Sequence, residues 1–88
     1  MNRHEAKPLA KRFAGLCGTA ARLGIYRPAA YRPDGVAPTQ FETAEDAASR
    51  ALFAHPDDVN GPRVEAALSA MERAVSEAET HAQGGARD

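Results

Sequence analysis

The sequence has 88 residues with eleven Lys and Arg against twelve Asp and Glu, so its formal net charge at pH 7 is only −1. A chain of this length accommodates one small domain, residues 1–88, and we expect residues 1–6 and 84–88 to be flexible termini. The single cysteine, Cys17, excludes an intrachain disulfide and a cysteine-based zinc site. Apolar runs of only a few residues exclude a membrane-spanning helix and the apolar core of a signal peptide, so we expect a cytoplasmic protein with no membrane partner.

Charge is distributed unevenly along the chain. Residues 1–33 contain seven Lys and Arg and one acid, whereas residues 34–88 contain eleven acids and four Arg. Such asymmetry indicates a charged partner, or two halves that face each other. Large apolar side chains are few and alanine occurs twenty times, which favours closely packed helices that gain from a second surface to bury.

The first predicted helix spans residues 8–23. Pro8 suits a first helical turn and Gly24 suits a helix end, while Gly15 and Gly18 lower the helix propensity of the interior. Apolar positions recur every three or four residues, as on one face of a helix. These positions are Leu9, Phe13, Leu16, Ala20 and Leu23.

Residues 25–41 form a different kind of segment, because Pro28, Pro33 and Pro38 forbid a continuous helix. The tripeptide Tyr-Arg-Pro occurs twice in it, and the Pro-Asp-Gly sequence at 33–35 has the composition of a turn. Two conformations fit this pattern: an extended arm packed across the helices, or a short β-hairpin whose prolines confine its strands to edges. The predicted fold class is therefore mainly α with an arm, or α+β if the hairpin forms.

The second predicted helix spans residues 43–54. Thr43 can cap its start with the side-chain hydroxyl, and Asp46 takes the place of the acid in a capping box. Pro56 ends the helix, because the residue before a proline disfavours helical backbone angles. The helix is short and rich in alanine, so we expect close packing against its neighbours.

The third predicted helix spans residues 62–83. Glu65, Glu72 and Glu79 recur every seven residues beside its apolar seam, where the e or g charges of a coiled coil stand. The seam suits either an intramolecular helix contact or pairing with a second copy of the chain. It consists of Val64, Leu68, Met71, Val75 and Ala78.

Residues with ligand or nucleophile chemistry are scattered. His55, Asp57 and Asp58 form the densest group, but three ligands in one loop are too few for a cation site, and a turn before the third helix explains them. Cys17 lies beside the apolar face of the first helix, away from a cluster of cations that would activate it. We therefore predict no catalytic, cofactor-binding or metal-binding residues, no cofactor and no small-molecule substrate, and hence no enzyme.

Basic and aromatic side chains alternate from the first helix into the arm. Guanidinium groups contact phosphates and tyrosine rings stack on bases, which favours nucleic acid. The eleven acids of the C-terminal half and the lack of a known nucleic-acid-binding motif argue against it. A second interpretation is internal: the tyrosines pack on the helices while Arg27 and Arg32 pair with acids of the C-terminal half.

From these observations we predict a small non-enzymatic protein-interaction module that acts as an accessory subunit, adaptor or inhibitor. Its partner is another protein or a second copy of the chain, because Tyr and Arg are enriched at protein interfaces. The alternative is a nucleic-acid-binding protein that uses the basic N-terminal half, and a weaker alternative is an acidic mimic of nucleic acid that blocks a nucleic-acid-handling protein. The predicted partner-binding residues are Arg22, Tyr26, Arg27, Tyr31, Arg32, Glu65, Glu72 and Glu79.

Overall fold

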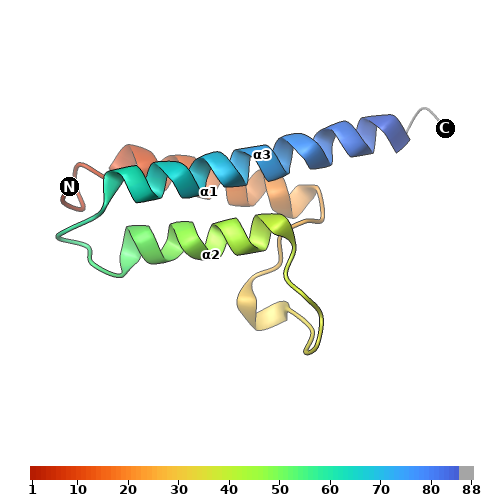
Figure 1. Ribbon diagram of the computed structural model, residues 1–88, viewed down its shortest axis with the longest axis horizontal. Helices are drawn as coiled ribbons and strands as arrows, with labels where there is room; N and C mark the ends of the chain where they lie inside the picture. Colours follow the sequence, from red (N-terminus) through yellow and green to blue (C-terminus); the bar gives the residue numbers. More distant parts are fainter. Residues whose placement is uncertain (86–88) are drawn as a thin grey trace.

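The computed structural model describes residues 1–85 and contains three α-helices: α1 (Lys7–Arg22), α2 (Gln40–Phe53) and α3 (Gly61–Gly85) (Figure 1). A one-turn 3₁₀ helix, η1 (Ala29–Tyr31), lies between α1 and α2. The mainly α fold class is therefore confirmed. Of the C-terminal segment expected to be flexible, residues 86–88 lie outside the described residues.

The β-hairpin expected as one option between the first two helices does not form: residues 1–85 contain no strand. Proline has no N–H to donate to a neighbouring strand. Instead, the N–H of Tyr31 donates to the carbonyl of Pro28 at 2.8 Å, and the N–H of Val36 donates to the carbonyl of Pro33 at 3.4 Å. Gly35 stands in this second turn with a φ of 78°, which glycine adopts without a steric penalty. The α+β option is wrong, and the segment is an arm.

The three helices lie roughly side by side, with α2 and α3 packed along each other and α1 behind them (Figure 1). A helix rises about 1.5 Å per residue, so the 25 residues of α3 make it much longer than α2, which has 14. The C-terminal end of α3 consequently extends beyond the other two helices. Within residues 1–85, no helix combines the length and the apolar character that crossing a membrane requires.

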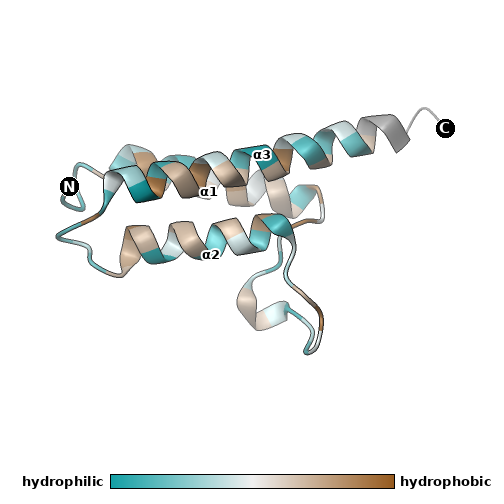
Figure 2. Ribbon diagram, viewed as in Figure 1, coloured by the Kyte–Doolittle hydropathy of each residue, from teal (hydrophilic) through white to brown (hydrophobic). Residues whose placement is uncertain are grey.

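The centre of the core contains four large side chains, Phe41 from α2 and Val64, Leu68 and Met71 from α3, each at most 1% exposed. Figure 2 shows hydrophobic residues alternating with hydrophilic ones along the helices, as expected where only one face of each helix is buried. Small side chains at the helix contacts let the backbones approach closely, which compensates for the small number of large ones. The buried alanines are Ala6, Ala20, Ala44, Ala48 and Ala74.

The start of α2 differs from the prediction. The helix begins at Gln40, and its N-cap is Thr39, whose hydroxyl oxygen accepts from the N–H of Glu42 at 3.1 Å. Glu42 in turn accepts from the N–H of Thr39 at 2.8 Å, which completes a capping box. Thr43, the predicted cap, lies inside the first turn and donates its hydroxyl to the carbonyl of Thr39 at 3.2 Å. The Thr-x-x-acid pattern occurs at both places, and the earlier one forms the cap.

Residues 1–6 fold against the connection between α2 and α3. The carbonyl of Met1 accepts from the N–H of Val59 at 2.6 Å. Asn2 and Glu5 exchange hydrogen bonds, in which each side-chain oxygen accepts from the other residue's backbone N–H, at 2.8 and 3.0 Å. The buried Ala6 then leads directly into α1. These bonds place the first residues of the chain beside the end of α2.

Candidate functional site

The candidate site is built around Glu42, the buried charged side chain of the described residues, whose exposed fraction is 0%. It lies in the first turn of α2 and accepts four hydrogen bonds. One carboxylate oxygen accepts from the backbone N–H and the Nε of Arg27, at 2.8 and 3.1 Å, and the other accepts from Arg27 Nη2 at 3.2 Å and from the N–H of Thr39. A buried carboxylate is tolerated only when it is paired and hydrogen-bonded in this way.

A second arginine adds to the same cluster. Arg32 Nε donates to the carbonyl of Arg27 at 2.9 Å and lies 3.7 Å from Glu42, while its Nη2 lies 3.6 Å from Glu45. The hydroxyl of Thr39 donates to the carbonyl of Ile25 at 2.5 Å. The arm, which we define as residues 25–39, is therefore held at its beginning, its middle and its end by contacts that converge on Glu42.

The electrostatics of this cluster keep Glu42 ionised. The side-chain hydrogen bonds from Arg27 lower its pKa to about 2 against the opposing effect of burial, and the backbone N–H groups of Thr39 and Arg27 add to the lowering. The neighbouring Glu45 behaves differently, because burial raises its pKa and Arg32 only partly opposes this. At neutral pH the arm is thus closed on a fully charged carboxylate.

The two tyrosines of the arm have opposite environments. Tyr26 packs edge-on against the buried Phe41, with ring centroids 5.5 Å apart, and this burial raises the pKa of its hydroxyl. Tyr31 is the last residue of η1 and is 78% exposed, and Val36, five residues later, is 53% exposed. Figure 1 shows the arm projecting away from the bundle below the start of α2. The arm therefore turns one aromatic ring inward and presents the other to solvent.

The structure separates the predicted partner-binding residues of the N-terminal half. The ring of Tyr26 packs on Phe41, and the guanidinium groups of Arg27 and Arg32 contact Glu42, so these groups are engaged within the chain. Tyr31 faces solvent, and Arg22 is exposed on α1, where its guanidinium donates to the hydroxyl of Thr19 at 3.3 Å. The five residues do not form one continuous surface of basic and aromatic groups.

The predicted acidic edge of α3 is divided as well. Glu72 accepts a hydrogen bond of 2.6 Å from Arg12 Nε and a second bond from Arg12 Nη2, and Glu65 lies 3.6 Å from the same guanidinium. Glu79 is exposed further along the helix. Two of the three carboxylates thus join α3 to α1 within one molecule, as in the intramolecular contact that the sequence left open.

Glu42 and Thr39 were not among the predicted site residues. A signal for them was present, because threonine and glutamate stand three residues apart, as a capping box requires. What the sequence does not show is that the same carboxylate also binds Arg27, which is 15 residues earlier.

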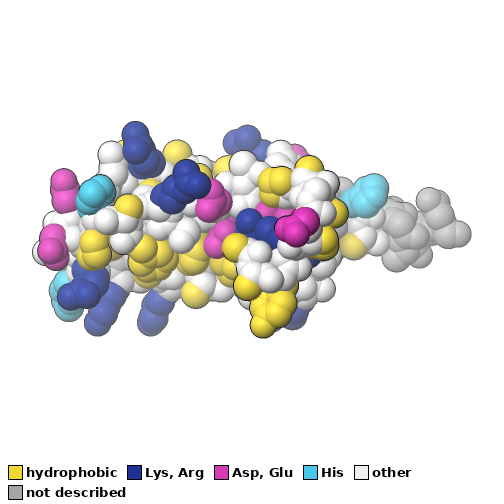
Figure 3. Space-filling view, turned by 90° about the horizontal axis from the view of Figure 1, so that it is seen from below, with side chains coloured by type: hydrophobic (Ala, Val, Ile, Leu, Met, Phe, Trp, Pro, Cys, Tyr) yellow, Lys and Arg dark blue, Asp and Glu magenta, His cyan; other side chains and the backbone are white. Residues whose placement is uncertain are grey.

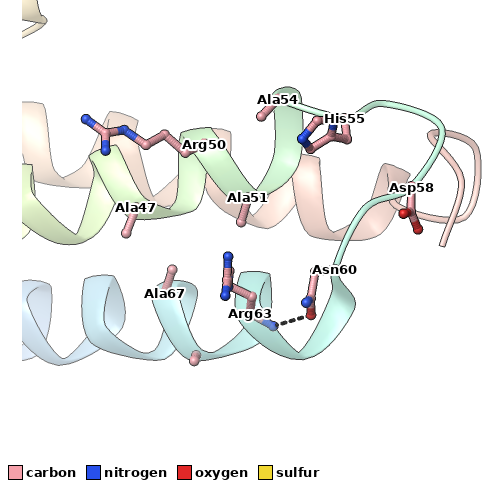
Figure 4. A pocket seen from close by; sticks show the side chains of 10 residues that line it. Ala47, Arg50, Ala51, Ala54, His55, Asp58, Asn60, Arg63 and Ala67 are labelled. Atoms are coloured by element: carbon pink, nitrogen blue, oxygen red, sulfur yellow. Dashed lines mark hydrogen bonds between the residues drawn. The ribbon is translucent and has the colours of Figure 1, made fainter.

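A separate hollow of about 640 Å³ opens between the end of α2 and the start of α3 (Figure 4). Arg50, Arg63 and His55 surround a floor of alanines such as Ala51 and Ala67. Arg50 pairs with Asp46 at 3.1 Å, and the N–H of Arg63 donates to the side chain of Asn60 at 3.1 Å. Within residues 1–85, no three His, Cys, Asp or Glu side chains gather as metal ligands, here or elsewhere. The hollow is open and lacks a buried polar group that would orient a ligand.

No protein-family model, curated protein or solved structure matches this chain. The features that bear on function are therefore the geometry of the arm and the surfaces that the bundle leaves exposed. Among these features, the Glu42 cluster stands out because burial of its carboxylate is costly and its hydrogen bonds fix the position of the arm.

Proposed function

We propose that the protein is a small non-enzymatic interaction module that binds another protein through the tip of the arm. The tip consists of Tyr31, the turn at 33–36 and the side chain of Val36. One observation carries this proposal: a fully buried carboxylate, Glu42, holds the arm in place, while the tip contributes little to the core and leaves Tyr31 78% exposed.

The arm is largely exposed to solvent. Residues 28–31 and 33–38 are all exposed, so apolar burial stabilises this part of the chain only weakly. Burying a carboxylate is costly, and a well-packed apolar group of similar size is often at least as stabilising. A chain with so few large side chains nevertheless places a charge at this position. The arrangement is reasonable if the ordered arm itself has a role.

An ordered arm favours binding because less conformational entropy is lost on association. Tyrosine is enriched at the energetic centres of protein interfaces, since its ring offers a large contact area and its hydroxyl a hydrogen bond. Tyr31 and Val36 together offer an aromatic and an aliphatic contact on a preorganised loop. This chemistry fits an accessory subunit, an adaptor or an inhibitor that inserts the tip of the arm into a pocket of its partner.

The internal pairing of the arm's arginines favours a protein partner over nucleic acid. Arg27 pairs with Glu42, and Arg32 contacts both Glu42 and the carbonyl of Arg27. Either arginine would have to give up these contacts in order to bind a phosphate. The acidic mimicry is disfavoured for a similar reason, because Glu42 is buried and Glu72 binds Arg12.

The experiment that tests the proposal is affinity capture from the native host with three forms of the chain: wild type, Tyr31→Ala/Val36→Ala, and the control Arg73→Ala/Glu77→Ala. Arg73 and Glu77 are exposed like Tyr31 and Val36 but lie on α3, so the control truncates two exposed side chains elsewhere and leaves the net charge unchanged. Circular dichroism confirms that each form is folded. A partner lost only with Tyr31→Ala/Val36→Ala supports the proposal. Capture of the same proteins by all three forms, or loss only with the control, contradicts it.

A further inference from the structure

A second surface lies at the opposite end of α2 from the arm, where the start of α1 meets the α2–α3 connection. A hollow of about 230 Å³ opens there, and we call it the end groove. Its walls are almost entirely apolar, with the basic residues at its rim. It is lined by Arg3, Ala6, Lys7, Ala10, Leu52, Phe53, Pro56 and Val59.

The apolar part of the end groove is held in place by the fold. Ala6, Leu52 and Val59 form buried walls, and Phe53 forms an edge that is 57% exposed. The ring of Phe53 stands nearly perpendicular to that of Phe13, with centroids 6.0 Å apart, so its orientation is supported by α1. An apolar cavity of roughly 150 Å³ admits a benzene ring, so this hollow has room for one large apolar side chain.

The rim of the end groove is basic. Arg3 and Lys7 line it, and Lys11 follows one helical turn later on the exposed side of α1. Within residues 1–85, none of these three side chains forms an ion pair. The acid nearest in the sequence is Glu5, which bonds to the N–H of Asn2. Asp57 and Asp58 are exposed in the connection, between the lining residues Pro56 and Val59. Figure 3 shows Lys and Arg side chains next to hydrophobic ones at this end of the molecule, with acidic and His side chains also present there.

We propose that the end groove binds an acidic amphipathic helix of a partner protein. One large apolar side chain of that helix enters the hollow beside Phe53, and carboxylates spaced four residues apart pair with Lys7 and Lys11. The spacing carries the argument, because positions four apart lie one turn along a helix, so basic side chains on α1 match acidic ones on a helix alongside it. A partner that inserts one side chain fills a concave hollow, whereas a partner with a flat surface would leave it empty.

The end groove is a different surface from the arm, so it is tested separately, with a defined peptide in place of the natural partner. The probe is a fluorescein-labelled 18-residue helical peptide with leucines on one face and glutamates flanking them, and its matched control carries lysine in place of each glutamate. Fluorescence anisotropy measures the binding of each peptide to the full chain at 50 and 300 mM salt. We expect the acidic peptide alone to bind, and its affinity to fall severalfold at the higher salt.

Two charge-matched variants locate the binding site. Lys7→Glu/Lys11→Glu reverses the rim of the end groove and should weaken binding of the acidic peptide at least tenfold. Arg63→Glu/Arg73→Glu makes the same change in net charge on α3 and should alter the affinity less than twofold. Phe53→Ser should weaken binding at both salt concentrations, and Tyr31→Ala should leave it unchanged, which separates this surface from the arm.

Several results would overturn the proposal. One is absence of binding by the acidic peptide, and another is equal binding of both peptides. A third is an equal loss of binding in the two charge-reversal variants, because it would show attraction to overall charge alone. Light scattering completes the test by measuring the oligomeric state of wild type and of Lys7→Glu/Lys11→Glu. If wild type is a dimer and the variant is a monomer, the end groove binds a second copy of the chain. That result would exclude a helix of another protein as its natural occupant.

Discussion

Glu42 binds both the backbone and the side chain of Arg27, because one carboxylate oxygen accepts from the Arg27 N–H at 2.8 Å and from its Nε at 3.1 Å. The backbone bond fixes where the chain passes, and the guanidinium neutralises the buried charge. A charged pair with this many hydrogen bonds is strong when complete and costly when one partner is removed. The stability of the bundle and the position of the arm therefore depend on the same carboxylate.

Replacement of Glu42 should destabilise the protein strongly. Glu42→Gln keeps an acceptor but loses the charge, and we expect the free energy of unfolding to fall by about 2 kcal/mol. Glu42→Ala also leaves the N–H groups of Arg27 and Thr39 without their acceptor, so the loss should reach about 3–5 kcal/mol. Urea denaturation followed by circular dichroism measures both. The control is Glu45→Gln, which should cost less than about 1 kcal/mol, and a similar cost for all three variants would contradict this role of Glu42.

Acid should weaken the fold through Glu42. Its pKa is about 2 in the folded protein, below the ordinary value of 4.5, so the unfolded chain takes up the proton first as the pH falls. The stabilisation is fully present above the ordinary pKa and is lost as the pH falls toward 2. Glu45, whose pKa is raised by burial, acts in the opposite direction and partly offsets the loss. Urea denaturation between pH 7 and pH 2.5 should show the gap between wild type and Glu42→Gln narrowing, and a constant gap would argue against this linkage.

The sequence predicts the three helices well because their signals are local. The seam of α3 repeats at helical spacing, and Gly24 ends α1 with a φ of 76°. The start of α2 was predicted too late because Thr39 and Thr43 both precede an acid by three residues. The local patterns are equivalent, and the distinction comes from Arg27, a distant residue that pairs with the acid of the first pattern. The prolines of the arm disfavour strand pairing, and its position is fixed by Glu42, a residue outside it, so the pattern of the arm alone left both conformations open.

The cap at Thr39 can be distinguished from Thr43 by mutation. Thr39→Ala removes both the acceptor for the N–H of Glu42 and the donor to the carbonyl of Ile25, and we expect a loss of about 1–2 kcal/mol in the free energy of unfolding. Thr43→Ala removes only an exposed bond within the first turn and should change stability by less than about 0.5 kcal/mol. Denaturation of the two variants under the same conditions gives the comparison. The reverse order would place the cap at Thr43.

The thiol of Cys17 should react slowly. Burial raises its pKa to about 11, with a smaller effect from the charge of Glu45, so very little thiolate is present at pH 8. We expect alkylation by iodoacetamide to be at least tenfold slower in the folded protein than in 6 M urea, where the thiol has its ordinary pKa. Mass spectrometry at timed intervals follows the modification. Equal rates in the two conditions would show that the fold neither shields the thiol from the reagent nor raises its pKa.

Gly18 of α1 offers a way to stabilise the bundle through helix propensity alone. Gly18 lies in the helix interior, and a Cβ added there meets no atom within 4 Å, so Gly18→Ala gains helix propensity without a clash. We expect the free energy of unfolding to rise by about 0.5–1 kcal/mol, measured by urea denaturation. Gly24→Ala is the control, because the space around it is equally open but its φ is positive, so the substitution should lower stability by about 1 kcal/mol. Opposite signs at two equally uncrowded glycines would show that backbone conformation, and not packing, decides the effect, whereas a loss of stability at both would contradict the expected gain in helix propensity at Gly18.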